Sequence, residues 1–193
     1  MRMLRVLVID ELEARAGEIC AGLALAGHQV AALLPTAADL TRRVEEIGPD
    51  VILIQTDAPS RDTLEHLAVI NAAAPRPVVM FARRGDGPVM RKAFKAGVSA
   101  YVVDGLRRER LKPLIEVAIA RFEEHQALKC ERDDATQKLA ERKTIDRAKG
   151  VLMKARGMDE EQAYAALRKL AMDRGQTLGR AAADVVEMAK VLL

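Results

Sequence analysis

The chain is predicted to be an α/β protein in which a doubly wound, five-strand parallel sheet precedes a long helix and a small three-helix, all-α domain. Two observations predict the sheet: short apolar runs alternate with helical patterns over residues 1–122, and polar residues seldom interrupt these runs. Such runs are typical of strands buried on both faces of a parallel sheet. The long helix is predicted by a stretch after Pro113 that has no Gly or Pro before Gly150.

Hydrophobic spacing predicts the individual strands and the helices between them. The apolar side chains of Ile19, Leu23 and Ala26, for example, recur at helical intervals. In a doubly wound sheet, functional side chains gather at the carboxyl ends of the strands. The expected strands cover residues 4–9, 30–34, 51–54, 78–81 and 100–103.

The region after the sheet should form one helix from Leu114 to about Arg156. Its apolar residues keep only a broken seven-residue rhythm, at Leu128, Ala135 and Leu139. The segment is therefore compatible with a coiled-coil homodimer and also with a single, solvated connecting helix.

Helix-ending and helix-starting residues divide the end of the chain. Gly157 is expected to end the long helix, Asp159 to cap the next helix in a capping box with Gln162, and Gly175 to close it. A third helix is expected over residues 178–193. We predict three parts: a sheet domain of residues 1–122, a helical connector or coiled coil of residues 123–137, and a small helical domain of residues 138–193.

Composition is that of an ordinary globular protein, with 50% hydrophobic and 31% charged residues among 193. The first apolar run is too short for a signal peptide, and no run reaches membrane-spanning length, so we expect a cytoplasmic protein with no membrane partner. Cys20 and Cys130 have neither CxxC spacing nor a histidine cluster beside them. We therefore expect no disulfide, no metal site and no cofactor.

Positive charge is concentrated in the last part of the chain. Residues 138–193 hold 12 Lys and Arg against 8 Asp and Glu, whereas the preceding residues hold 19 against 20. On the long helix, Lys138, Arg142, Lys149 and Arg156 fall within about 40° of one another, beside an apolar stripe. This pattern favours a helix that packs on one face and binds a polyanion beside it.

The same region contains three sequence blocks in register, at residues 142–153, 163–168 and 171–172. They resemble the ANTAR domain, the RNA-binding module of the AmiR and NasT antitermination regulators. The resemblance implies that the protein binds leader RNA hairpins, which in this family are paired stem-loops with six-nucleotide loops bound by a dimer. It also implies that RNA polymerase is affected only indirectly, through an antiterminator structure, and that the protein is not an enzyme.

The cationic side chains of this region are the candidate RNA-binding groups. They would contact phosphates, which carry little sequence information, whereas specificity needs unpaired bases. Tyr164 is the one aromatic residue after Phe122, and we expect it in the helical core rather than against a base. Arg168, Lys169 and Arg174 form the next group to test. The candidate RNA-binding residues are Lys138, Arg142, Lys149, Arg156 and Arg168.

Several residues of the first domain stand where a known regulatory domain has its motifs. They are Asp10-Glu11 after the first strand, Pro49-Asp50 before the third, Pro59 beyond it, Pro77 before the fourth, and Ala96-Gly97 with Tyr101 around the fifth. This pattern resembles the receiver domain of response regulators, which has a flavodoxin-like fold. The resemblance implies transfer of a phosphoryl group from a histidine kinase to an aspartate that ends the third strand. Carboxylates that bind magnesium, a hydroxyl and a lysine would assist.

That phosphorylation site is degenerate in this sequence. Gln55 stands at the acceptor position, and its amide cannot form an acyl phosphate at neutral pH. Ala82 stands where a hydroxyl is expected, and Asp104 puts a negative charge in the place of the lysine, where it would repel a phosphoryl group. Asp10 and Glu11 remain, either as weak magnesium ligands or as caps of the following helix.

A receiver without an acceptor needs another input. Asp57 is a poor substitute, because two residues past Gln55 its side chain would lie on the other face of the strand or in a loop. Residues 59–65, 80–81 and 97–101 look especially like NasT-like regulators of nitrate and nitrite assimilation. Such regulators are held inactive by a nitrate-binding partner, NasS. The resemblance implies control by a nitrate-sensor protein resembling NasS rather than by phosphorylation.

Two other classes of function stay open. A DNA-binding response regulator with an atypical receiver would carry a short recognition helix after a tight turn, whereas Arg142 and Lys149 lie on the first and longest helix. An α/β enzyme could use the carboxylates at the carboxyl edge of the sheet. The sequence, however, has no Gly-rich phosphate loop and no nucleophile elbow.

Overall fold

The computed structural model describes residues 2–11, 16–103 and 107–192. Its contacts divide the chain into two compact units, Met1–Gln126 and Ala127–Leu193, which we call the N-terminal unit and the C-terminal unit. Helix α5, Arg108–Arg156, contributes residues to both units. Among the described residues, no helix is both long and apolar enough to cross a membrane.

The N-terminal unit is built on a five-strand sheet in the order β2-β1-β3-β4-β5, and every neighbouring pair is parallel. The predicted doubly wound sheet is therefore confirmed, and each strand begins and ends within two residues of its expected bounds. The strands are β1 (Arg5–Asp10), β2 (Gln29–Leu34), β3 (Val51–Thr56), β4 (Val78–Ala82) and β5 (Ala100–Val103).

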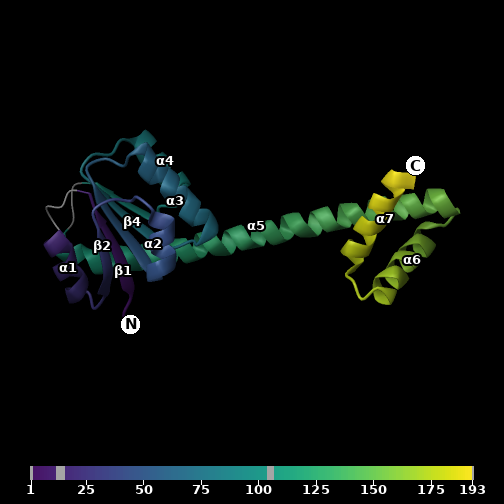
Figure 1. Cartoon of the computed structure of the whole chain (residues 1–193), viewed down its shortest axis with the longest axis horizontal. Helices are drawn as coiled ribbons and strands as arrows, with labels where there is room; N and C mark the ends of the chain where they lie inside the picture. Colours follow the sequence, from purple (N-terminus) through teal and green to yellow (C-terminus); the bar gives the residue numbers. More distant parts are fainter. Residues whose placement is uncertain (1, 12–15, 104–106, 193) are drawn as a thin grey trace. The chain divides into compact units, whose positions relative to one another are not determined.

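Helices cover both faces of this sheet (Figure 1). Side chains of α2, α3 and α4 pack on one face, and those of α1 and the first turns of α5 pack on the other. Strand β1 shows why both faces are apolar: Leu7 and Ile9 join the first core, while Val6 and Val8 join the second. The helices before α5 are α1 (Ala16–Leu25), α2 (Leu40–Ile47), α3 (Arg61–Ala73) and α4 (Gly87–Lys95).

Helix α5 begins at Arg108 and not at Leu114, so the predicted start was wrong and Pro113 lies inside the helix. A proline within a helix costs about 3 kcal/mol, because it lacks an amide hydrogen and its ring crowds the preceding turn. Leu111 and Ile115 are fully buried against the sheet. Burying two such side chains contributes roughly 3–6 kcal/mol, which outweighs the proline.

The C-terminal unit combines the end of α5 with α6, Glu160–Asp173, and α7, Leu178–Leu192. The predicted capping box is confirmed, since the Asp159 side chain accepts from the Gln162 amide and the Gln162 side chain accepts from the Asp159 amide. Gly157 and Gly175 follow α5 and α6 with φ of 65° and 61°, a left-handed conformation that favours glycine. The core is small: buried Ala148, Leu167 and Ala182 are surrounded by the partly buried Ile145, Leu152, Leu178, Val185 and Val186.

Candidate functional site

The carboxyl edge of the sheet brings together four of the five predicted phosphorylation-site positions. Asp10 of β1 is paired in register with Gln55 of β3, and the two are 2% and 4% exposed. Ala82, the last residue of β4, is buried as well. Glu11 follows β1 directly and its amide donates to the carbonyl of Gln55 over 3.0 Å. Asp104, the fifth position, lies outside the described residues.

The side chains at this edge have little of the chemistry that phosphoryl transfer requires. A carboxamide at position 55 offers only hydrogen bonds, and Ala82 offers no hydroxyl. Within the described part of the chain, Gln55 Oε1 is buried without a hydrogen-bond partner. Among all the residues that the structure describes, no group of three or more His, Cys, Asp or Glu is placed to hold a metal ion.

Glu11 is held at the start of α3. Its Oε1 accepts a hydrogen bond of 3.2 Å from Thr63 Oγ1, which itself lies 2.9 Å from Ser60 Oγ. Ser60 caps α3 by accepting from the Thr63 amide over 3.0 Å. The Glu11 carboxylate thus engages the first turn of α3 next to the degenerate site.

Asp57 lies beyond the end of β3 and its side chain is 51% exposed. It forms an ion pair with Arg83, whose Nη1 lies 3.9 Å from Asp57 Oδ1. This position agrees with the expectation that Asp57 lies in a loop rather than beside Asp10.

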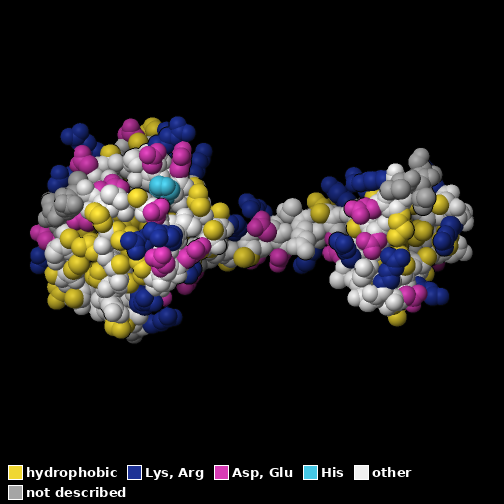
Figure 2. Space-filling view, viewed as in Figure 1, with side chains coloured by type: hydrophobic (Ala, Val, Ile, Leu, Met, Phe, Trp, Pro, Cys, Tyr) yellow, Lys and Arg dark blue, Asp and Glu magenta, His cyan; other side chains and the backbone are white. Residues whose placement is uncertain are grey.

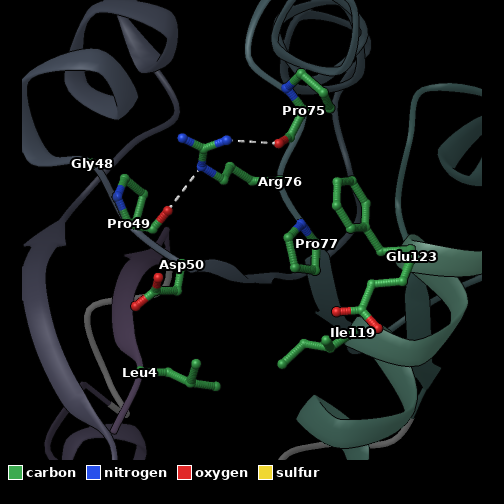
Figure 3. Close-up of a pocket in the computed structure, with 10 residues that line it drawn as sticks. Leu4, Gly48, Pro49, Asp50, Pro75, Arg76, Pro77, Ile119 and Glu123 are labelled. Atoms are coloured by element: carbon green, nitrogen blue, oxygen red, sulfur yellow. Dashed lines mark hydrogen bonds between the residues drawn. The ribbon is translucent and has the colours of Figure 1, made fainter. Parts of the chain in front are cut away.

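A hollow of about 330 Å³ lies at the opposite, amino-terminal edge of the sheet (Figure 3). Two of its polar side chains, Arg76 and Asp50, form hydrogen bonds to the backbone. Arg76 donates from Nε to the carbonyl of Pro49 over 3.0 Å and from Nη1 to that of Pro75 over 2.9 Å. Asp50 accepts from the Arg5 amide over 2.8 Å. We assign the hollow no ligand.

Four of the five predicted RNA-binding cations lie exposed on the C-terminal unit. None of the four makes an ion pair with another described residue. Their charges are therefore free to meet phosphate groups. We call this set the basic edge: Lys138, Arg142 and Arg156 of α5, and Arg168 of α6.

Lys149 differs from the expectation that its charged end would be open to solvent. Its side chain is only 16% exposed, and its Nζ lies 2.8 Å from Asp146 Oδ1 and 2.8 Å from Glu160 Oε1. Hydrogen bonds to these carboxylates raise the pKa of Lys149 above its ordinary value, and the bond from Lys149 lowers the pKa of Asp146. Lys149 therefore joins α5 to α6.

Tyr164 was expected in the helical core, and the structure shows that this was wrong, since its side chain is 45% exposed. Buried alanine and leucine side chains form the core of the C-terminal unit instead.

A further set of cations was missed by the sequence analysis. Lys143, Arg147 and Lys154 are exposed on α5, and none makes an ion pair within the described chain. At 100° per residue they fall within about 40° of one another, on the side of α5 opposite Ile145 and Leu152, which pack against the core. The same helical arithmetic would have found them. We call Lys143, Arg147 and Lys154 the opposite face. Figure 2 shows Lys and Arg side chains around this unit, with hydrophobic side chains over α7.

Comparison with known families gives this unit a name. The family model described as the ANTAR domain matches residues 133–186, which include the end of α5, all of α6 and part of α7. The chain carries an ANTAR domain. The resemblance seen in the sequence is thereby confirmed.

Two relatives resemble the chain over different lengths. The transcriptional regulatory protein PdtaR of Mycobacterium tuberculosis is 28% identical over 183 residues, which are 95% of this chain and 89% of that protein. The nitrate regulatory protein of Klebsiella oxytoca is 53% identical over 55 residues, which are 28% of this chain and only 12% of that protein. Both relatives are named as regulatory proteins.

Solved structures show the receiver fold of the N-terminal unit. The signal receiver domain of a modulated diguanylate cyclase from Desulfovibrio desulfuricans has a TM-score of 0.56 at 18% identity, over 64% of this chain and 99% of that one. A CheY-like response regulator receiver protein from Methanospirillum hungatei has a TM-score of 0.55 at 18% identity, again over 64% and 99%. At such identities the likeness concerns the fold alone.

Proposed function

We propose that the chain is a transcription antitermination regulator that binds stem-loops in the leader RNA of nitrate or nitrite assimilation operons. The observation that carries the proposal is the basic edge, four exposed cations inside the ANTAR match that make no ion pair with any described residue. The likeness of 55 residues of the chain to part of a nitrate regulatory protein supports the operon class.

The basic edge would bind by neutralising phosphates. Guanidinium and ammonium groups position a nucleic acid with little dependence on its sequence, and each neutralised phosphate releases counterions, so binding weakens with salt. Binding would stabilise the antiterminator structure of the leader RNA and so let RNA polymerase continue. This effect needs no contact between this chain and the polymerase.

A sensor protein resembling NasS would control this activity. The support is chemical: Gln55 cannot carry an acyl phosphate, and Ala82 removes the hydroxyl that would orient it. A receiver domain still offers a surface through which a partner can bias two states of the protein. The exposed Leu128 and Leu139 of α5 are compatible with the homodimer that paired hairpins require.

The proposal is tested by comparing the affinity of the protein for a leader hairpin with its affinity for a promoter duplex. The two nucleic acids carry the same label and are titrated at the same salt concentration. A regulator of antitermination binds the hairpin more tightly. Tighter binding of the duplex would favour a DNA-binding response regulator, and binding of neither would remove the nucleic-acid function.

A further inference from the structure

Tyr164 is an aromatic side chain that the fold does not use. It is the one aromatic residue after Phe122, yet it is 45% exposed, while the core beside it is formed by Leu167 and small alanines. Tyrosine is enriched at interfaces because its ring is apolar while its hydroxyl can stay hydrated.

The ion pair between Lys149 and Glu160 shows on which side of the unit this ring lies. Glu160, Tyr164, Arg168 and Met172 follow one another at intervals of four, so they occupy successive turns along one flank of α6. Glu160 Oε1 reaches Lys149 Nζ of α5 over 2.8 Å. The row therefore begins beside Lys149, which lies between Arg142 and Arg156 on one stripe of α5.

The charges and shapes along this row suit an RNA loop. Glu160 is the only acid of the row and is neutralised by Lys149, whereas Arg168 makes no ion pair in the described chain. Met172 is 72% exposed and adds a flexible thioether after Arg168. Single-stranded loops present unstacked bases to aromatic side chains and phosphates to nearby cations.

Resting on the RNA-binding function proposed above, we propose that Tyr164 is a specificity-determining residue, on whose ring an unpaired base of the hairpin loop stacks. Arg168, one turn further along α6, binds a phosphate next to that base. The basic edge supplies the affinity that does not depend on sequence, and Tyr164 supplies the contact that requires an unpaired base.

Tyrosine fluorescence tests the contact directly, because the chain has no Trp and only two Tyr. The Tyr101→Phe variant leaves Tyr164 as the one tyrosine of the chain. The probe is the tightest binder from a pool of RNA hairpins with one constant stem and randomised six-nucleotide loops. Binding of this hairpin should quench the emission, and the same stem closed as a duplex without a loop should leave it unchanged.

Affinity of the same hairpin provides the second readout. Tyr164→Ala should weaken binding about 5- to 150-fold, since stacking contributes roughly 1–3 kcal/mol per base. Tyr164→Phe, which keeps the ring, should bind like the parent. Met188→Ala, an exposed apolar residue of α7 outside the row, is the matched control and should also bind like the parent. The salt dependence should stay unchanged in Tyr164→Ala and become weaker in Arg168→Ala.

The outcomes separate this inference from the function on which it rests. If the parent binds no hairpin from the pool, the RNA-binding function itself is wrong. If the parent binds with the expected salt dependence but Tyr164→Ala binds equally well and no quenching occurs, the stacking role is wrong. If Tyr164→Ala weakens RNA binding only as it weakens self-association, measured by sedimentation without RNA, the row is a protein interface and the inference is overturned.

Discussion

A single side chain, Lys149, shows how charge on this unit divides between folding and binding. Its ammonium meets Asp146 on its own helix and Glu160 on the next, and its side chain is mostly covered. Arg142, on the same stripe, is exposed and makes no ion pair in the described chain. Sequence spacing gave both residues the same role because it places residues on a helix face but does not say which neighbouring helix supplies a carboxylate.

Replacing Lys149 should therefore affect stability in a way that depends on pH. The pKa of Asp146 is lowered from 3.8 and the pKa of Lys149 is raised from 10.5. The stabilisation is thus present between these values, is lost as pH falls through the lowered pKa of Asp146, and is lost as pH rises through the raised pKa of Lys149. Lys149→Met should melt at a lower temperature than the parent at pH 7. This difference should shrink below pH 3.8 and above pH 10.5.

Lys143→Met is the matched control for that measurement, because Lys143 lies on the opposite face of α5 without an ion pair in the described chain. It should melt like the parent throughout. Equal melting of Lys149→Met and the parent at pH 7 would show that the two ion pairs contribute nothing measurable.

Gln55 leads to a second prediction at the same scale. Acetyl phosphate with magnesium should add no phosphoryl mass to the protein, because an amide is not a nucleophile and Ala82 supplies no hydroxyl. Intact-protein mass spectrometry measures this. A phosphoryl adduct that hydroxylamine removes would contradict the prediction and would direct attention to Asp57.

Among the elements, the strands and the capped helix termini were predictable, whereas the start of α5 was not. The strands of a parallel sheet are buried on both faces, so their apolar runs are visible in the sequence, as in β3. Asp159 and Gly157 act through local backbone geometry, which is also visible. The start of α5 was missed because burial of Leu111 against a distant strand overrides the local effect of Pro113.

The capping box of α6 should be important because the core of this unit is small. Asp159→Ala removes the side chain that accepts from the Gln162 amide over 2.7 Å, and should destabilise α6 by about 1 kcal/mol. Amide hydrogen exchange in α6 should then quicken about fivefold. Glu161→Ala, in the first turn of α6 but outside the box, should quicken exchange less. Exchange in Asp159→Ala no faster than in Glu161→Ala would mean that the cap is dispensable.

For the whole molecule, the receiver fold was predictable while its input was not, since the same fold serves many signals. If a sensor protein controls the chain, adding the sensor should lower hairpin binding by the full-length protein, and nitrate should restore it. Acetyl phosphate should change neither. Unaltered binding in the presence of the sensor, measured by fluorescence anisotropy, would remove this partner from the account.

The most direct measurement of the central claim compares two faces of one helix in the full-length protein. Arg142→Ala with Arg156→Ala removes two cations of the basic edge, and Lys143→Ala with Arg147→Ala removes two from the opposite face. The first pair should weaken hairpin binding and reduce the slope of log affinity against log salt by roughly 1.4 to 1.8, or about 0.7–0.9 for each lost phosphate contact. The second pair should leave affinity close to that of the parent. If the two pairs behave alike, or if only the opposite-face pair loses affinity and slope, the RNA does not bind at the basic edge.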